Sequence, residues 1–312
     1  MRFFRLIAAA MILLAGFFCS EALAYKLLVL GDCRNGSGNE DFRMTQQIIE
    51  DAVSYAAKGN DLRGIILTGD YVTNSANEQE WGKFKNAYQK AFAYPVYPCP
   101  GNHDRGGLFY GTWSYYDFFS VPRWYSKNIE GIHLVALDAM RAELGFLSPA
   151  SALLERRQFQ WLKQDLEADN STFTIVIWHE PAYASHPGQA MGHGSNIFMR
   201  ERYVALCENS AVDLILCGHN HMYERTAPIK NRAEEQGGII HITTGGGGAP
   251  LHPLPDDKDL LQDCKGNALS QVQKSAYHFC VLTVENSVLT VEAIAYKSHE
   301  LLDAFQITRR QH

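Results

Sequence analysis

Several common patterns are absent from this chain of 312 residues, and each absence argues against a class of protein. No two cysteines have Cys-x-x-Cys spacing, which argues against a thiol redox site and a zinc ribbon. No Gly-x-Ser-x-Gly motif occurs, so a serine hydrolase with a nucleophile elbow is excluded. The formal net charge is -6 without a basic run, which argues against long nucleic acid as a partner. Internal repeats and Pro- or Ser-rich linkers are also missing, so we expect one folded domain.

One long apolar run is present, over residues 6–18, and no later stretch is long and apolar enough to cross a bilayer. Two arginines precede the run, and the small-x-small sequence Ala22-Leu23-Ala24 follows it. This order is typical of a secretory signal peptide. We therefore predict a signal peptide over residues 1–24, a single domain over residues 25–312, and a periplasmic or secreted location after cleavage near Ala24.

Six cysteines would remain after cleavage, an even number that permits disulfides in an oxidising compartment. Several of them lie in apolar segments, where a buried free thiol is an equally good interpretation. The sequence does not decide between pairing and free thiols for Cys33, Cys99, Cys207, Cys217, Cys264 and Cys280.

Short apolar runs alternate with amphipathic stretches, and the first five segments form a βαβαβ pattern. The predicted strands are residues 26–30, 64–68, 95–98, 132–137, 173–178, 212–216 and 239–243, followed by a hairpin over 279–284 and 288–296. The predicted helices are residues 42–58, 78–92, 150–168 and 199–209, and residues 245–266 resemble a loop. The pattern predicts an α/β fold of the α+β type, in which helices enclose two central mixed β-sheets.

Five of these strands end in a side chain that can bind a metal, and ligands bind at this edge of such sheets. Carboxylate, amide oxygen and imidazole groups together suit Zn, Fe, Mn or Co. A single Asp after a strand is more often a cap or turn residue, but five such endings are hard to attribute to chance. The five residues are Asp32, Asp70, Asn102, His179 and His219, and His221 follows two positions later.

The chain resembles calcineurin-like metallophosphoesterases, and within that superfamily it is most similar to the purple acid phosphatase branch. Five motif blocks in the same order carry the resemblance: Gly31-Asp32, Gly69-Asp70, Gly101-Asn102-His103-Asp104, His179 with its flanking Trp178 and Glu180-Pro181-Ala182-Tyr183, and Gly218-His219-Asn220-His221 with the extension to Arg225. The resemblance implies the four-layer architecture of that superfamily and a centre of two metal ions, Fe, Zn or Mn.

The resemblance also implies roles for individual residues. Asp70 would bridge the two ions, Asp32 and His221 would bind the first, and Asn102, His179 and His219 would bind the second. A hydroxide on the metals would attack phosphorus. His103 would stabilise the phosphoryl oxygens or protonate the leaving group, with Asp104 orienting its ring.

Two positions depart from the family pattern. Arg34 stands where many members carry a histidine ligand of the first metal, and Thr73 stands where the purple enzymes carry a tyrosine ligand. We expect no tyrosinate–iron colour from position 73, and the neighbouring Tyr71 is a poor substitute. We favour Arg34 as a clamp for a phosphate oxygen over a salt bridge to Glu40 or Asp41.

The remaining histidines and the aromatic stretch are not assigned to the metal centre. We expect His133, His241, His278 and His299 to be packing or surface residues. For the aromatic stretch over residues 113–125, core packing is favoured over stacking on a substrate ring. His186 and His193 lie in a Gly-rich loop that is solvent-exposed or forms a wall of the site.

The predicted signal peptide indicates export, and the resemblance implies a phosphoesterase with two metal ions. Its partner would be a phosphate-ester small molecule or a phosphorylated substrate, and monoesters are favoured. A phosphodiesterase or nucleotide-directed hydrolase of the same fold is the first alternative. A non-catalytic protein that binds metal or phosphate on this scaffold is the second.

Overall fold

The computed structural model describes residues 24–34, 41–104, 113–139, 149–185, 194–254 and 269–308. Apart from Ala24, the predicted signal peptide lies outside the described residues, as do Glu40, His186, His193 and Cys264. No helix among the described residues is long and apolar enough to span a bilayer.

The first sheet has six strands among the described residues, in the order β15-β14-β13-β1-β2-β3. Strands β1, β2 and β3 are parallel and are joined through helices α1 and α2, which confirms the βαβαβ pattern. The strands are β1 (Tyr25–Leu30), β2 (Leu62–Leu67), β3 (Val96–Pro98), β13 (His278–Glu285), β14 (Val288–Ala295) and β15 (Leu301–Thr308). The predicted hairpin is the antiparallel pair β13 and β14, and β15 extends it.

The second sheet has seven strands among the described residues, in the order β12-β8-β11-β7-β6-β5-β4. The central strands β5, β6, β7 and β11 are parallel, whereas β4, β8 and β12 pair antiparallel with their neighbours. The strands are β4 (Tyr125–Ile129), β5 (Ile132–Ala136), β6 (Phe173–Ile177), β7 (Leu214–Cys217), β8 (Tyr223–Thr226), β11 (Ile240–Thr244) and β12 (Ser270–Lys274), beside a small pair β9 (Ile229–Lys230) and β10 (Ala233–Glu234).

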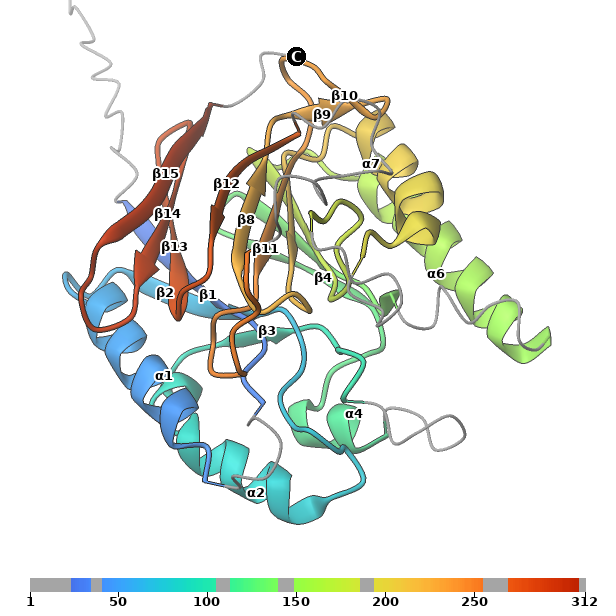
Figure 1. Ribbon diagram of the computed structural model, residues 1–312. Helices are drawn as coiled ribbons and strands as arrows, with labels where there is room; N and C mark the ends of the chain where they lie inside the picture. Colours follow the sequence, from blue (N-terminus) through green and yellow to red (C-terminus); the bar gives the residue numbers. More distant parts are fainter. Residues whose placement is uncertain are drawn as a thin grey trace, which may run out of the picture.

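Helices cover the outer faces of both sheets (Figure 1). The helical segments are α1 (Arg43–Ala56), α2 (Glu78–Ala87), η1 (Ala91–Ala93), α4 (Trp113–Phe119), α6 (Pro149–Glu167), the π-helical η4 (Met199–Val204) and α7 (Ala205–Asn209). The helix expected over residues 199–209 is therefore two segments, η4 and α7. Of the region expected to be a loop, residues 245–254 contain neither helix nor strand.

Three apolar clusters hold the four layers together, and the alternation of side chains in β1 shows how. Leu27 and Val29 face the cluster between the sheets, whereas Leu28 and Leu30 face the cluster beneath α1 and α2. Successive residues of a strand point to opposite faces, so a strand buried on both sides must be apolar throughout. A third cluster packs α6, η4 and α7 on the second sheet. The predicted two-sheet, four-layer architecture is confirmed.

The five described cysteines are buried free thiols: Cys33, Cys99, Cys207, Cys217 and Cys280. The aromatic stretch also packs in the core, since Tyr115 is buried and stacks on Tyr71. His278 contacts Thr244 within the fold, and His299 pairs with Asp51 at the surface.

An ion pair between β5 and α6 should make stability depend on pH. His133 Nε2 lies 2.7 Å from Asp165 Oδ2. Burial lowers the pKa of His133, but Asp165 and Asp169 outweigh this effect and raise the pKa above its ordinary value. A raised pKa in the folded state stabilises the protein below the pKa of the unfolded chain, and this stabilisation is lost as pH rises through the folded value.

We therefore expect His133→Gln to lower the free energy of unfolding more at pH 6 than at pH 9. Urea unfolding at both pH values measures this difference. In an Asp165→Asn background the pH dependence of the effect should shrink, because the carboxylate partner is gone. A His133→Gln effect of the same size at both pH values would contradict the interpretation.

A polar bridge ties β15 of the first sheet to β8 of the second sheet. Asp303 accepts a hydrogen bond from Tyr223 Oη at 2.8 Å and two from the Arg225 guanidinium at 2.5 and 3.1 Å. Asp303→Ala would leave both donors without this carboxylate. Because Arg225 keeps 15% of its side chain exposed, we expect a loss of about 2 kcal/mol, less than for a fully buried pair. Urea unfolding checks this value, and the exposed Glu300→Ala is the control.

Candidate metal centre

The six predicted ligands come together where the carboxyl ends of strands from both sheets meet. Asp32 and Asp70 follow β1 and β2 of the first sheet, and Asn102 follows β3. His179 and His219 follow β6 and β7 of the second sheet. Backbone hydrogen bonds join these strand ends, including Asp32 N–H to Gly69 O at 3.1 Å and Gly218 N–H to His179 O at 2.9 Å. The site therefore exists only when both sheets are in place.

Contacts between neighbouring donor atoms link the four residues that the resemblance assigns to the second metal. His179 Nε2 lies 3.3 Å from Asp70 Oδ1 and 3.1 Å from Asn102 Oδ1. His219 Nδ1 lies 2.9 Å from the same Asn102 oxygen. A tetrahedral metal with ligands at roughly 2.1 Å separates its donors by roughly 3.4 Å. The spacing therefore fits one ion.

The imidazoles are oriented by backbone carbonyl groups behind them. His179 Nδ1 donates to Thr68 O at 2.7 Å, and His221 Nδ1 donates to Pro250 O at 2.6 Å. A carbonyl oxygen can only accept, so these nitrogens carry the protons and each Nε2 faces the site. Such bonds select the tautomer and ring orientation that a metal ligand needs.

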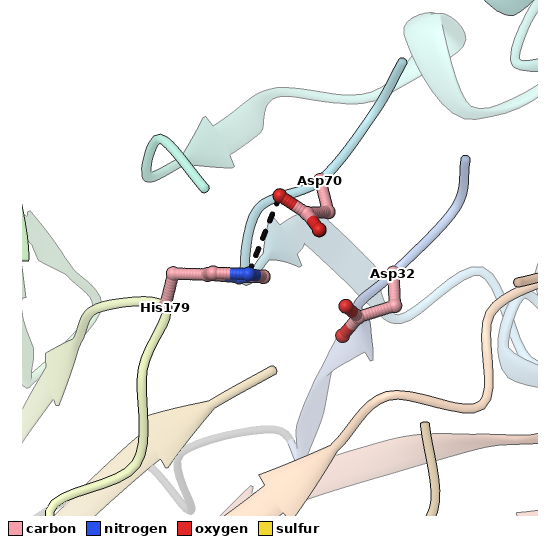
Figure 2. A group of neighbouring side chains, drawn as sticks. All are labelled: Asp32, Asp70 and His179. Atoms are coloured by element: carbon pink, nitrogen blue, oxygen red, sulfur yellow. Dashed lines mark ion pairs between the residues drawn. The ribbon is translucent and has the colours of Figure 1, made fainter. Parts of the chain in front are cut away.

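Two buried carboxylates give the site its charge. Asp32, Asp70 and His179 are almost completely buried and offer ligand atoms within 4.8 Å of one another (Figure 2). Burial raises the pKa of Asp70, but His179 and His103 outweigh it and hold the pKa below the ordinary range. Burial lowers the pKa of His179, but the carboxylates of Asp70 and Asp32 raise it well above its usual value. The site therefore demands positive charge, which a proton or a metal ion can supply.

The first position has three of these ligands and one additional cation. His221 Nε2 lies 3.5 Å from Asp32 Oδ1, a buried oxygen that makes no hydrogen bond. The guanidinium of Arg34 also enters this position, with Nε 3.4 Å from Asp70 Oδ2. Asp41, one candidate partner for Arg34, instead pairs with Arg43. Arg34 therefore lies within the candidate metal centre.

Neither Thr73 nor Tyr71 supplies the missing tyrosine ligand. The hydroxyl of Tyr71 is buried and contacts the carbonyl oxygens of Leu67 and Cys99 at 3.1 and 2.7 Å. Burial raises the pKa of Tyr71 well above its ordinary value, so its hydroxyl stays protonated.

The turns that carry the candidate ligands include residues with unfavourable, left-handed backbone conformations. Asp32, Asp70 and His219 have φ values of 55°, 59° and 72°, in the left-handed region. Such residues are uncommon and cost about 1–2 kcal/mol each, and they cluster at functional sites. Gly218 allows one of these turns to pack closely, because a Cβ there would lie 2.5 Å from Asp32 Oδ2.

His103 and Asp104 have different surroundings. His103 Nδ1 donates to Thr73 O at 2.9 Å, and its Nε2 lies 4.0 Å from Asp70 Oδ2. Its ring is therefore oriented by Thr73 and not, as the sequence suggested, by Asp104. The Asp104 carboxylate instead accepts backbone N–H groups of Gly101 and Asp70 at 2.8 Å and of Tyr71 at 2.9 Å. Asp104 thus joins the β2 and β3 turns and positions Asp70.

His252 is a neighbour of the site that sequence reasoning missed. Its ring stacks on His221 with centroids 4.2 Å apart, and its Nδ1 accepts the His221 N–H at 3.2 Å. It lies outside every motif block, in a segment without helix or strand. Only the run of glycines shortly before it could have drawn attention to this loop. His241, in contrast, is buried and its ring packs against Tyr183, as a packing residue would.

A family model for calcineurin-like phosphoesterases matches residues 25–223. The chain belongs to this family. Purple acid phosphatase 22 of Arabidopsis thaliana is 34% identical over 134 residues, which cover 42% of this chain and 28% of that protein. Acid phosphatase type 7 of Homo sapiens is 28% identical over 221 residues, which cover 61% of this chain and 49% of that protein. The matched part of the chain thus spans half or less of the length of these curated relatives.

Solved structures share the fold. The purple acid phosphatase PPD1 from yellow lupin (Lupinus luteus) seeds has a TM-score of 0.73 at 21% identity, over 93% of this chain and 54% of that one. GAP50, the anchor in the inner membrane complex of Plasmodium, has a TM-score of 0.65 at 18% identity, over 92% of this chain and 90% of that one. The family binds metals, and the donor spacing and the bare buried oxygen of Asp32 fit that property.

Asp104→Asn tests the positioning of the metal-bridging candidate. The amide would place an N–H₂ group against at least one backbone N–H that the carboxylate now accepts. We expect a loss of about 2 kcal/mol in the free energy of unfolding. We also expect weaker Mn²⁺ binding, because the Asp70 turn would shift.

Thermal unfolding and Mn²⁺ titration measure these two effects. The exposed Asp117→Asn removes the same charge elsewhere and should change neither. Unaltered stability and Mn²⁺ affinity in Asp104→Asn would show that this carboxylate does not position Asp70.

Proposed function

We propose that the protein hydrolyses phosphate esters in a metal-dependent reaction and prefers monoesters. The observation that carries this proposal is the row of donor contacts in which Asn102 Oδ1 lies beside both His179 Nε2 and His219 Nδ1. His179 Nε2 also lies beside Asp70 Oδ1, and His103 lies at the margin of this group. The names of the acid phosphatase relatives support a monoester substrate. When bound, metal would neutralise charge on the phosphoryl group and provide a nucleophile at neutral pH.

His103 is the group best placed to act on the substrate directly. Its side chain is 31% exposed, whereas Asp70 beside it is buried. Because Nδ1 donates to Thr73 O, the ring presents Nε2 toward the Asp70 side of the site. A protonated Nε2 there can donate to a phosphoryl oxygen or to the leaving oxygen.

We propose that the fully loaded centre holds two ions of Fe, Zn or Mn. The two oxygens of Asp70 support this, since Oδ1 faces His179 and Oδ2 faces Arg34 at the other position. The second position would be held by Asp70, Asn102, His179 and His219, and the first by Asp32, Asp70 and His221.

We also propose export to the periplasm or the outside of the cell. The support is the order of charged, apolar and small residues over positions 1–24. A substrate met there is expected to be a small phosphate ester or a phosphorylated molecule.

Asn102→Ala tests the proposed function, because it removes one oxygen ligand and leaves the other ligands in place. Purified residues 25–312 would be assayed with p-nitrophenyl phosphate and bis-p-nitrophenyl phosphate, with Mn²⁺ or Zn²⁺. We expect metal-dependent turnover that falls at least 100-fold in Asn102→Ala, because the second position loses a ligand. The ratio of the two rates separates a monoesterase from a diesterase.

The matched control is Asn86→Ala, an exposed asparagine on α2 whose substitution should leave turnover unchanged. Elemental analysis of the same samples counts the bound ions. Bound metal without turnover of either substrate, or of nucleotides, would favour a non-catalytic binding protein on this scaffold.

A further inference from the structure

Arg34 is held at the metal centre by its backbone as well as by its charge. Its N–H donates to Asp70 O at 2.9 Å, so residue 34 is fixed beside the turn that bears the bridging carboxylate. Its side chain is only 15% exposed and points toward the first position. This arrangement places a permanent positive charge among buried acids, because a guanidinium does not lose its proton in proteins.

The guanidinium faces the same atoms that would bind the first ion. Its Nε is 3.4 Å from Asp70 Oδ2, and one terminal nitrogen is 3.5 Å from His221 Nε2. A metal bound to these two atoms needs distances of about 2.1 Å. Two cations cannot share such a volume without strong repulsion.

Arg34 balances the charge of Asp70 but does not form a hydrogen-bonded salt bridge with it. Its Nε is buried and makes no hydrogen bond, although Asp70 Oδ2 is close enough for an ion pair. A structural arginine that pairs with a carboxylate frequently forms two parallel hydrogen bonds. The guanidinium can therefore be displaced without breaking such a fork.

We propose that Arg34 and the first metal ion are alternative occupants of one position. The protein then binds one ion tightly, at the second position, and a second ion only weakly, after the guanidinium has moved out. This inference rests on the metal centre of the proposed function. It adds the order in which the two positions bind metal ions. A displaced guanidinium next to the centre is also where a phosphate oxygen would be clamped.

Metal binding to Arg34 variants tests the proposal without reference to activity. Arg34→Gln removes the charge at similar size, Arg34→Lys keeps the charge, and Arg34→His restores the ligand type found in many relatives. Equilibrium dialysis of Mn²⁺ with elemental analysis would count tight and weak sites. The exposed Arg43→Gln is the control for loss of a surface charge.

We expect one tight and one weak site in the wild type. The weak site should strengthen at least tenfold in Arg34→Gln and further in Arg34→His, and stay weak in Arg34→Lys. The electron paramagnetic resonance spectrum of Mn²⁺ should show a coupled pair of ions in Arg34→His at concentrations where the wild type shows isolated ions. In chelator, Arg34→Gln should melt below the wild type, and added Mn²⁺ should reverse that order.

The same measurements distinguish failure of this inference from failure of the proposed function. Two equally tight ions in the wild type, or a weak site that Arg34→Gln leaves weak, would overturn this inference and leave the proposed function standing. No bound ion in the wild type or in any variant would overturn both.

Discussion

Two carboxylates buried in close proximity impose the main physical constraint on this protein. Asp32 and Asp70 end neighbouring parallel strands and have almost no contact with solvent. Buried anions are unfavourable unless cations and hydrogen-bond donors surround them. The structure supplies the backbone N–H groups of His103 and His219, the imidazoles of the second sheet and the guanidinium of Arg34.

This constraint explains why the centre is built from strand ends and not from one continuous loop. Parallel strands place their carboxyl ends at one edge, so each sheet contributes ligands that are far apart in sequence. The apolar cluster between the sheets sets the distance between those edges. Packing of this interior therefore controls the spacing of the ligands, and a shift of the sheets would separate the donors.

The groups around the candidate ligands fix the orientation of those ligands through hydrogen bonds. Carbonyl groups of Thr68, Thr73 and Pro250 orient three imidazoles, and Asp104 holds the turn that carries Asp70. Burial and the nearby Asp70 carboxylate raise the pKa of Asp104 to about 7, although the backbone N–H groups of Gly101 and Tyr71 and the charge of His179 act in the opposite direction. Positive charge at the centre would relieve this repulsion, which links the centre to the stability of the turn.

The sequence alone determined the parallel β1–β2–β3 unit, the central strands of the second sheet and the family, because these depend on local periodicity and contiguous motifs. It did not predict β4, β8, β12 or β15, since these partly polar strands at or next to the sheet edges lack a continuous apolar run and are defined by the strands they pair with. Only the tertiary structure decided that Thr73 and not Asp104 orients His103, that His252 stacks on His221, and that Arg34 faces Asp70 and His221. Each of these depends on side-chain direction across elements far apart in the chain, which spacing within the sequence does not encode.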